Sequence, residues 1–340
     1  MIIARAPLRL PLGGGGTDLE FYATEFGGFV LSVAIDKYAY VTVLRPPIER
    51  GIRVKARINE YEERLDDIKN ELVRECLRYA GVTERIQVTF SSDLSDGTGM
   101  GTSGAYAVAL MAALHFVTRK PHAPKILAEA AAHVELELLK RPIGKHDQYM
   151  AAFGGLKLLC IAKDRSVAVV APEISRQTMH DLKNNLMLFY TGTRRESSAV
   201  LGAQKEAAEK QGGKDVFEYY HAIKDIGVRI YETLVAGDVS RFGGFLHEHW
   251  QTKKRLAGGV SNPGFDHLYD EARDHGAIGG KLVGAGGGGL FLFFVPPRVQ
   301  AAFSLFMQER GCEHVPFAFE PWGVELSMPF SPAVSLRAKS

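Results

Sequence analysis

The side chains best suited to chemistry in this chain of 340 residues lie in three glycine-rich segments. The first segment, PLRLPLGGGGTD, places Arg9 and Asp18 on either side of four consecutive glycines. The second is DGTGMGTSGA, and the third is the GAGGGG sequence from Gly284 to Gly289. Because glycine has no Cβ, a ligand can approach the main chain closely at such positions. The three segments therefore predict a site where a ligand lies against the backbone.

The second segment predicts a nucleotide phosphate site, because it directly precedes a long Ala-rich helical stretch. The free N–H groups and the positive dipole end at a helix N-terminus attract phosphate. A tight turn alone would explain two of these glycines, but not three separate glycine-rich segments in one chain. The residues expected to hold the phosphates are Gly97, Gly99, Met100, Gly101, Thr102, Ser103 and Gly104.

Two other phosphate loops fit this segment less well. Gly99, Gly101 and Gly104 match GxGxxG, but a second helical stretch follows the first. A dinucleotide-binding fold needs a strand with an acidic end at that place. The chain also contains no GxxxxGK[ST] sequence of the Walker A type.

Composition excludes several classes of protein. The 41 basic and 39 acidic residues are interspersed, so no basic stripe indicates nucleic-acid binding. No apolar run reaches the roughly 18 residues of a membrane span, and we expect a cytoplasmic protein. The three cysteines are far apart, which excludes a disulfide framework. His247 and His249 do not predict a metal site, because residues i and i+2 of a helix face apart by about 200°.

Two α+β domains, residues 1–175 and 176–340, are predicted from the order of the elements. In the first, strands are expected over 1–10, 29–46, 84–90 and 154–162, and helices over 62–81, 104–120 and 123–142. In the second, we expect a strand near 186–190, helices over 217–237 and 239–256, and two strands joined by the third glycine segment.

Taken together and in order, the three segments resemble the three motifs of the GHMP kinase superfamily of small-molecule kinases. The stretches that carry the resemblance are APLRLPLGGGGTD, DGTGMGTSGA and KLVGAGGGGLFLFF, which extend from residue 6 to residue 294. The resemblance implies a two-domain GHMP kinase fold. Its N-terminal domain would be like ribosomal protein S5 domain 2, its C-terminal domain would be ferredoxin-like, and the active site would lie between them.

Within the superfamily, the stretches GKHDQYMAAFGG and LFYTGTRR are similar to bacterial kinases of the heptose-phosphate type. This likeness implies ATP- and Mg²⁺-dependent phosphorylation of the anomeric hydroxyl of D-glycero-D-manno-heptose 7-phosphate, giving the 1,7-bisphosphate. Gly15 and Gly16 stand where galactokinases carry a Glu-His pair, which disfavours galactose. Thr102 replaces the usual first serine of the second motif and keeps its hydroxyl. A fucose or N-acetylhexosamine kinase, a non-catalytic sugar and nucleotide sensor, and a homodimer stay open.

The resemblance also implies roles for four polar residues. Ser103 and Glu135 would hold Mg²⁺, although Glu135 could equally be a solvent-facing helix acid. Asp147 would accept the proton of the anomeric hydroxyl, which is more acidic than an ordinary alcohol, so that a carboxylate of ordinary pKa suffices. The alternative for Asp147 is an N-cap of the following helix. Arg9 would lie beside the base, or would form a strand-end salt bridge.

The acceptor is expected to lie against the first and third glycine segments. The residues that would contact it are Gly14, Gly15, Gly16, Thr17 and Asp18, with Gly286 and Gly287 at the floor of the site. A substrate phosphate needs a basic anchor, and bidentate arginines suit a phosphate dianion. Arg194 and Arg195 are the main candidates, and Lys145 and Lys281 are weaker ones. The alternative for the two arginines is a pair of solvated surface side chains.

Overall fold

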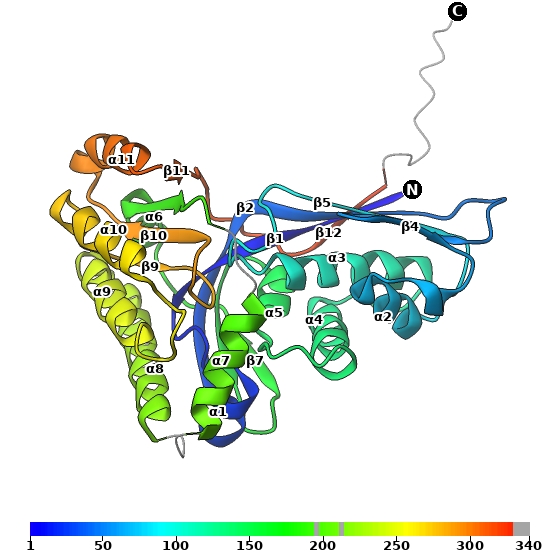
Figure 1. Cartoon of the computed structure of the whole chain (residues 1–340), viewed down its shortest axis with the longest axis horizontal. Helices are drawn as coiled ribbons and strands as arrows, with labels where there is room; N and C mark the ends of the chain where they lie inside the picture. The colour runs from blue at the N-terminus through cyan, green and yellow to red at the C-terminus, as the bar shows by residue number, and fades with distance from the viewer. Residues whose placement is uncertain (194–196, 211–213, 329–340) are drawn as a thin grey trace, which may run out of the picture.

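The computed structural model describes residues 1–193, 197–210 and 214–328. Within these residues the chain forms one sheet of eight strands and one of four. The long strands β1 and β2 run through the middle of the molecule, with helices α2 to α5 at one end and the second sheet with α8 to α10 at the other (Figure 1). None of the helices in this described part is both long and apolar enough to cross a membrane.

The larger sheet is built around an antiparallel pair, β1 (Ile2–Gly13) and β2 (Gly28–Leu44). Its strand order is β12-β1-β2-β5-β3-β4, and β6 pairs with β2 and β7 beside this path. The strand β12 comes from the far end of the described chain, so the sheet joins distant segments. The other strands are β3 (Ile52–Lys55), β4 (Asn59–Glu62), β5 (Ile86–Ser92), β6 (Leu156–Ile161), β7 (Val167–Val170) and β12 (Glu325–Ser327).

Strand β1 is irregular where Arg9 lies. The register with β2 shifts between Pro7 and Leu8, and again between Pro11 and Gly13. Proline has no N–H to donate to a ladder, and such irregularities bend a strand and turn its side chains. Between the two shifts, the Arg9 N–H donates to the Met100 carbonyl at 3.3 Å. The sheet is therefore joined at this point to the second glycine-rich segment, Gly97 to Gly104, which we call the phosphate segment.

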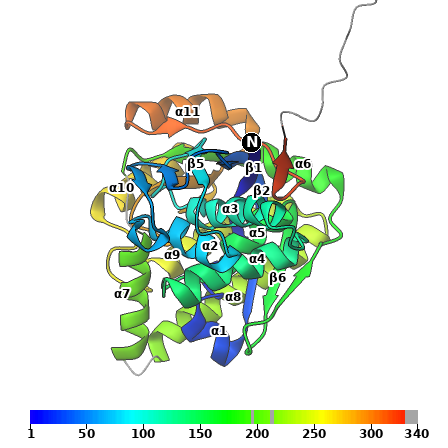
Figure 2. The same cartoon turned by 90° about the vertical axis from the view of Figure 1, so that its right-hand side faces the viewer.

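Helices α2 to α5 pack beside one another under the larger sheet (Figure 2). Helix α3 (Thr102–Val117) is the helix predicted over 104–120, and it is buried along most of its length. This burial agrees with its Ala-rich sequence, since a helix that is apolar on all sides belongs in a core. The neighbouring helices are α2 (Glu71–Ala80), α4 (Pro124–Ala132) and α5 (His146–Phe153). Helix α1 (Glu20–Phe26) packs instead against α8 through aromatic side chains.

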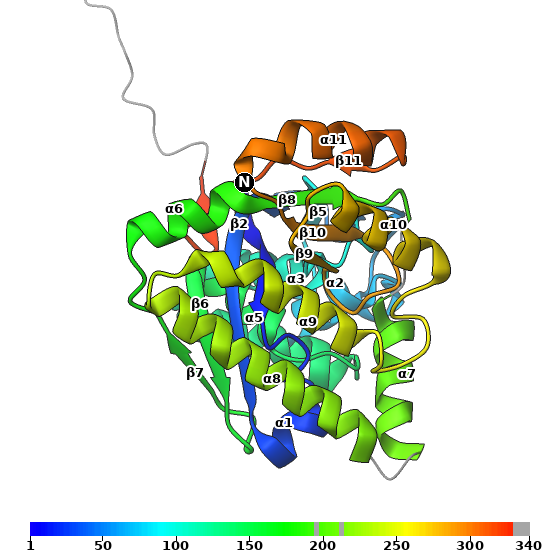
Figure 3. The same ribbon diagram turned by 90° about the vertical axis from the view of Figure 1, so that its left-hand side faces the viewer.

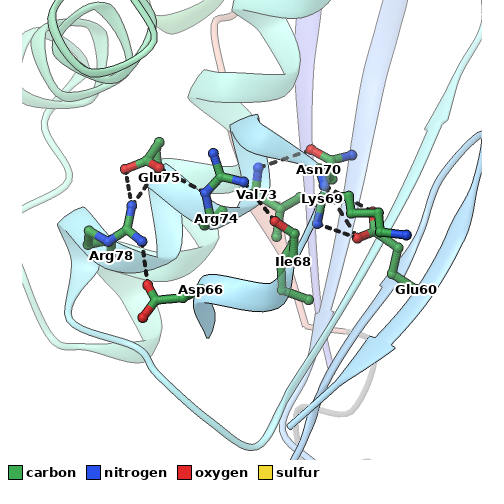
Figure 4. Close-up of polar contacts among 9 residues, drawn as sticks. All are labelled: Glu60, Asp66, Ile68, Lys69, Asn70, Val73, Arg74, Glu75 and Arg78. Atoms are coloured by element: carbon green, nitrogen blue, oxygen red, sulfur yellow. Dashed lines mark hydrogen bonds and ion pairs between the residues drawn. The ribbon is translucent and has the colours of Figure 1, made fainter. Parts of the chain in front are cut away.

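The helix predicted over 62–81 begins only at Glu71. The Asn70 side chain accepts a main-chain N–H of the first turn, which is the usual N-cap contact. The Glu60 carboxylate accepts the main-chain N–H of Asn70 at 3.0 Å (Figure 4). The predicted start was wrong because these polar contacts compete with the helix, and a short 3₁₀ helix (Leu65–Asp67) lies before them.

The helix predicted over 123–142 is divided. After α4 the chain continues as a π-helix, His133–Leu138, and leaves helical geometry before Pro142. A π-helix widens the turn and is frequent at functional sites. Glu135 lies in this widened turn and is fully buried, so the alternative of a solvent-facing acid was wrong.

The smaller sheet has the strand order β11-β8-β10-β9, all antiparallel. Taken in chain order the elements give β-α-β-β-α-β, which is the ferredoxin-like arrangement. The family resemblance implied this arrangement, and it is confirmed. The strands are β8 (Leu186–Tyr190), β9 (Gly279–Leu282), β10 (Leu290–Phe294) and β11 (Glu313–His314). The helices are α6 (Arg176–Asn185), α7 (Ser197–Lys210), α8 (Lys214–Val235), α9 (Phe242–Lys253), α10 (Pro263–Asp274) and α11 (Gln300–Glu309), with 3₁₀ turns at Val239–Arg241 and Pro297–Val299.

Helix α8 crosses the end of β1 and β2, and α9 lies beside it (Figure 3). Two glycines permit this close crossing. A Cβ on Gly13 would lie 2.8 Å from the Gly227 Cα, and a Cβ on Gly227 would lie 2.8 Å from the Gly14 nitrogen. The first residue of the glycine run therefore serves the packing of α8 against β1.

Candidate active site

Arg9 and Asp147 form the central ion pair of the site, as predicted. The Arg9 Nε and Nη2 atoms lie 2.7 and 2.6 Å from Asp147 Oδ1. The Arg9 Nη1 atom donates to the Gly99 carbonyl at 2.7 Å. Arg9 is buried, and Asp147 lies in the first turn of α5. One guanidinium therefore joins β1, the phosphate segment and α5.

Two glycines of the phosphate segment make room for Asp147. A Cβ on Gly101 would lie 2.9 Å from the Asp147 Cγ, and a Cβ on Gly104 would lie 2.7 Å from the Asp147 Cβ. Gly101 also has φ +75°, a conformation that other residues adopt at a cost. These glycines are thus required by the approach of α5 as well as by any phosphate.

Asp18 is tied to the same helix. Its Oδ2 accepts the main-chain N–H of His146 at 3.0 Å, and a Cβ on Gly144 would lie 1.9 Å from that oxygen. Burial raises the pKa of Asp18, the hydrogen bond from His146 opposes this, and the neighbouring Asp147 charge raises the pKa further. The carboxyls of Asp18 and Asp147 are therefore coupled through the start of α5.

Two cavities meet at the Arg9–Asp147 pair. The first, which we call the inner cavity, is lined by Gly15, Gly16 and Asp18. The loop cavity is the one lined by Gly97 and the following residues to Gly104, apart from Thr98. Six residues line both cavities: Arg9, Ile143, Asp147, Leu201, Gly284 and Ala285. Asp147 thus faces both spaces.

The loop cavity contains the predicted phosphate segment. Gly97, Gly99 and Gly101 all have positive φ, and the segment ends at the N-terminus of α3. The Met100 side chain is fully buried, so it anchors the segment. The Thr102 hydroxyl is buried and has no hydrogen-bond partner among the described residues. Such an unsatisfied group beside a helix N-terminus suits an anionic ligand.

At the other end of the loop cavity lies the start of α2. Asn70 and Leu72 line the cavity there, together with Arg57. This end is held by the contacts drawn in Figure 4, in which the Arg74 Nη1 atom donates to the Ile68 carbonyl at 2.8 Å. The capped start of α2 therefore forms a fixed wall of the cavity.

Ser103 and Glu135 lie together, as predicted, in a closed polar network. The Ser103 hydroxyl donates to Glu135 Oε1 at 2.7 Å, and Gln148 Nε2 donates to Oε2 at 2.6 Å. The sequence analysis missed Arg141, whose Nη1 atom lies 2.6 Å from the Ser103 hydroxyl and 2.7 Å from Glu135 Oε1. Arg141 lies three residues after the end of the π-helix, and no sequence pattern indicated its role.

The network fits Mg²⁺ in its donors. Mg²⁺ prefers hard oxygen ligands in an octahedral arrangement and usually keeps several waters. The oxygens of Ser103 and Glu135 are 2.7 Å apart, close enough to be neighbouring ligands of one ion. In the residues described, no group of three or more His, Cys, Asp or Glu side chains could hold a metal. In this structure the positive charge beside the Glu135 carboxylate is that of Arg141.

Four of the residues that we expected to contact the acceptor do not line either cavity. Thr17 is fully buried, and its hydroxyl oxygen lies 2.8 and 2.9 Å from the carbonyl oxygens of Gly14 and Phe29. A Cβ on Gly14 would lie 1.9 Å from the Phe29 carbonyl oxygen. A Cβ on Gly286 would likewise lie 2.6 Å from the Val260 carbonyl oxygen, and the Gly287 N–H donates to that oxygen at 2.7 Å. These residues therefore support the first and third glycine segments through internal contacts and do not face either cavity.

The third glycine segment packs against the phosphate segment. A Cβ on Gly289 would lie 2.4 Å from the Thr98 carbonyl oxygen, which requires glycine at this position. Arg194 and Arg195, the predicted anchors of a substrate phosphate, lie outside the described residues.

The inner cavity has a basic wall, of which the sequence analysis named only Lys281, as a weaker candidate for a phosphate anchor. The wall consists of His249 and Lys253 of α9 and Lys281 of β9. Burial, with a smaller contribution from the Arg9 charge, lowers the pKa of Lys281 to about 7. Burial likewise holds the pKa of His249 well below its usual range and lowers that of His146 to about 3. His249 and His146 are therefore neutral rings at pH 7.

Family models for the GHMP kinases N terminal domain and the GHMP kinases C terminal domain match residues 68–155 and 230–311, together half of the chain. The chain belongs to the GHMP kinase family. It is an enzyme of the ATP-dependent phosphotransferase class. The resemblance deduced from the three glycine segments is thereby confirmed.

Among curated relatives, D-glycero-alpha-D-manno-heptose 7-phosphate kinase of Campylobacter jejuni is 29% identical over 87% of this chain and 90% of its own length. Galactokinase of Pyrococcus furiosus is 25% identical over 85% of this chain and 87% of its own. A solved D-glycero-D-manno-heptose 1-phosphate kinase from Bacteroides thetaiotaomicron superposes with a TM-score of 0.79 at 24% identity, covering 97% of this chain and all of that one. A putative sugar kinase from Campylobacter jejuni gives a TM-score of 0.76 at 26% identity, covering 96% and 98%.

Proposed function

We propose that this GHMP kinase transfers the γ-phosphoryl group of ATP to the anomeric hydroxyl of a sugar phosphate, D-glycero-D-manno-heptose 7-phosphate, to give the 1,7-bisphosphate. The observation that carries the proposal is the position of Asp147. It lies on the wall shared by a cavity that holds the phosphate segment and a cavity that holds Gly15, Gly16 and Asp18. The name of the heptose 7-phosphate kinase relative supports this choice of acceptor.

In the proposed reaction, the anomeric oxygen attacks the γ-phosphorus as the bond to the β,γ-bridging oxygen breaks. Its proton passes to Asp147. The Oδ1 atom of Asp147 is occupied by Arg9, whereas Oδ2 accepts no hydrogen bond from the described residues. Oδ2 is therefore the acceptor we propose. Arg9 keeps Asp147 oriented, and its charge offsets that of the transferring group.

ATP would bind with its phosphates on the main-chain N–H groups of the phosphate segment and near the Thr102 hydroxyl. Ser103 and Glu135 would hold Mg²⁺, which when bound shields charge on the phosphates. Arg141 would then no longer contact the oxygens of Ser103 and Glu135. Its guanidinium lines the loop cavity, so it remains within the space where the phosphates lie.

Asp18 and the exposed main chain of Gly15 and Gly16 would face the sugar hydroxyls. Thr17 and Gly14 would support them from behind. Arg194 and Arg195 stay a prediction as phosphate anchors. The domain limits of 1–175 and 176–340, the cytoplasmic location and a homodimer also stay predictions.

The test is turnover of ATP with Mg²⁺ against heptose 7-phosphate, the free heptose, hexoses, N-acetylhexosamines and fucose, with products placed by phosphorus NMR. We expect a new signal at C1 from heptose 7-phosphate, which Asp147→Asn removes. Asp266→Asn is the matched control, since Asp266 also lies in the first turn of a helix and pairs with a cation, Lys254, at 3.0 Å. Turnover only with another sugar would change the acceptor. Binding of sugar and ATP without turnover would favour a sensor.

A further inference from the structure

The basic wall of the inner cavity has the chemistry of an anion site. Lys281 is 2% exposed, and its Nζ lies 3.2 Å from the Leu12 carbonyl oxygen and 3.2 Å from His249 Nδ1. No carboxylate lies within ion-pair distance of Lys281 in the ranges that the structure describes. Burial of an amine without an acidic partner costs free energy, which a bound anion would offset.

Three donors converge on the same space from two elements. His249 and Lys253 are four residues apart on α9 and so lie on one face of that helix. Lys253 Nζ donates to the carbonyl oxygens of Leu282 and Gly284 at 2.9 and 2.5 Å, which fixes it beside β9. Lys281 projects from β9 itself. The wall is therefore rigid before any ligand arrives.

The anion that fits this wall belongs to the acceptor and not to ATP. Lys281, His249 and Lys253 line the inner cavity, whereas the loop cavity with the phosphate segment does not include them. The carboxyl of Asp18 lines the inner cavity too, and the charge of Arg9 acts on both Asp18 and Lys281.

We infer that Lys281, with His249 and Lys253, forms the subsite that binds the acceptor's own phosphate group. This inference rests on the proposed function, because it assigns the phosphate of the proposed sugar phosphate. According to this inference, residues of β9 and α9 make the enzyme prefer a phosphorylated sugar to a free one. His146, whose Nε2 is buried without a partner among the described residues, faces the same cavity and would contact the uncharged part of the sugar.

The first experiment compares heptose 7-phosphate with the unphosphorylated heptose as acceptors for Lys281→Met. We expect KM for the phosphorylated sugar to rise about 100-fold, as for loss of one partner of a buried charge pair. KM for the free heptose should rise much less, because that sugar has no phosphate group to lose the contact. Lys224→Met is the matched control. Lys224 also donates to two carbonyls, those of Phe26 and Gly27, but lines neither cavity.

The second experiment uses inorganic phosphate as the probe and the melting temperature as the readout, with saturating ADP to fill the loop cavity. Phosphate should raise Tm of the wild type and of Lys224→Met, and not of Lys281→Met. If Lys281→Met does not fold, Lys281→Gln and His249→Gln replace it. They should show the same selective rise in KM, smaller for His249→Gln.

Two results would overturn the subsite. One is an unchanged KM for heptose 7-phosphate in folded Lys281→Met, and the other is an equal loss with both sugars, which would place Lys281 at the reacting centre. If the wild type phosphorylates no sugar phosphate, the proposed function fails and the phosphate probe alone decides. A Tm rise that disappears in Lys281→Met would still support the subsite, and an equal rise in both proteins would overturn it.

Discussion

Two carboxylate–arginine pairs lie within the same site, and they differ in what surrounds them. Glu135 is fully buried, and both of its oxygens are engaged by Ser103, Arg141 and Gln148. The Asp147 side chain is 27% exposed, and only its Oδ1 carries the contacts with Arg9. The distances within the pairs are almost equal, at 2.7 and 2.6 Å.

The difference shows that an ion pair does not by itself make a catalytic carboxylate. In the Glu135 network both carboxylate oxygens are engaged, so the network holds the π-helix and the start of α3 in place. The Asp147 pair is open on one side, toward both cavities, so it can accept a proton. Accessibility of one oxygen separates the two roles that we propose.

We expect the largest loss of activity from a change in the Arg9–Asp147 pair, which we call the open pair. Asp147→Asn should lower kcat about 1000-fold, within the range for loss of a general base. Because the amide oxygen can still accept from Arg9, the variant should fold. Steady-state kinetics with a melting curve measures both quantities. Retention of wild-type kcat would show that Asp147 does not accept the proton.

Breaking the closed pair should act on stability first. Glu135→Ala leaves Arg141 and Gln148 without their partner, and we expect a loss of about 3 kcal/mol in the free energy of unfolding. Urea denaturation measures this. If Glu135→Ala and Asp147→Ala lose equal stability, the distinction between a closed and an open pair is wrong.

A smaller effect should follow from crowding the open pair. Gly101→Ala places a methyl group 2.9 Å from the Asp147 Cγ, and its positive φ adds a strain of about 1–2 kcal/mol. Gly81→Ala is the control, because Gly81 has φ +77° and no atom near its Cβ position. Both variants should lose stability, but only Gly101→Ala should lose kcat. Equal kcat in the two variants would mean that Asp147 tolerates displacement.

A third pair, on α2, should give the smallest effect, because one partner is exposed and a glutamine can keep the contact. The Glu75 side chain is 11% exposed and accepts from Arg78, whose side chain is 45% exposed, and this hydrogen bond is the main cause of a lowered pKa of Glu75 (Figure 4). Glu75→Gln should therefore cost less than about 1 kcal/mol at pH 7. A lowered folded-state pKa stabilises the fold above the unfolded pKa of about 4.5. The difference between variant and wild type should hence disappear as the pH falls through the lower folded pKa, which acid titration of the unfolding free energy will test.

Much of the fold follows from local sequence, since helix α3, the strands β1 and β2 and the β9–β10 hairpin lie where the apolar pattern predicts them. The start of α2 was misplaced because the decisive acceptor, Glu60, lies on a neighbouring strand. The break in the helix after α4 has no comparable local signal. Helices α10 and α11 were not predicted, although Asn262 caps α10 in the expected way.

The sequence by itself determined the family, and it predicted which residues would hold the phosphates. Glycines and a helix N-terminus act over a few residues, and their order along the chain is distinctive. Only the tertiary structure decided which charges face each other. Arg9 and Asp147 are separated by 138 residues, and Lys281 contacts the Leu12 carbonyl across 269. Burial and open oxygens arise where such distant segments meet, and no local pattern encodes them.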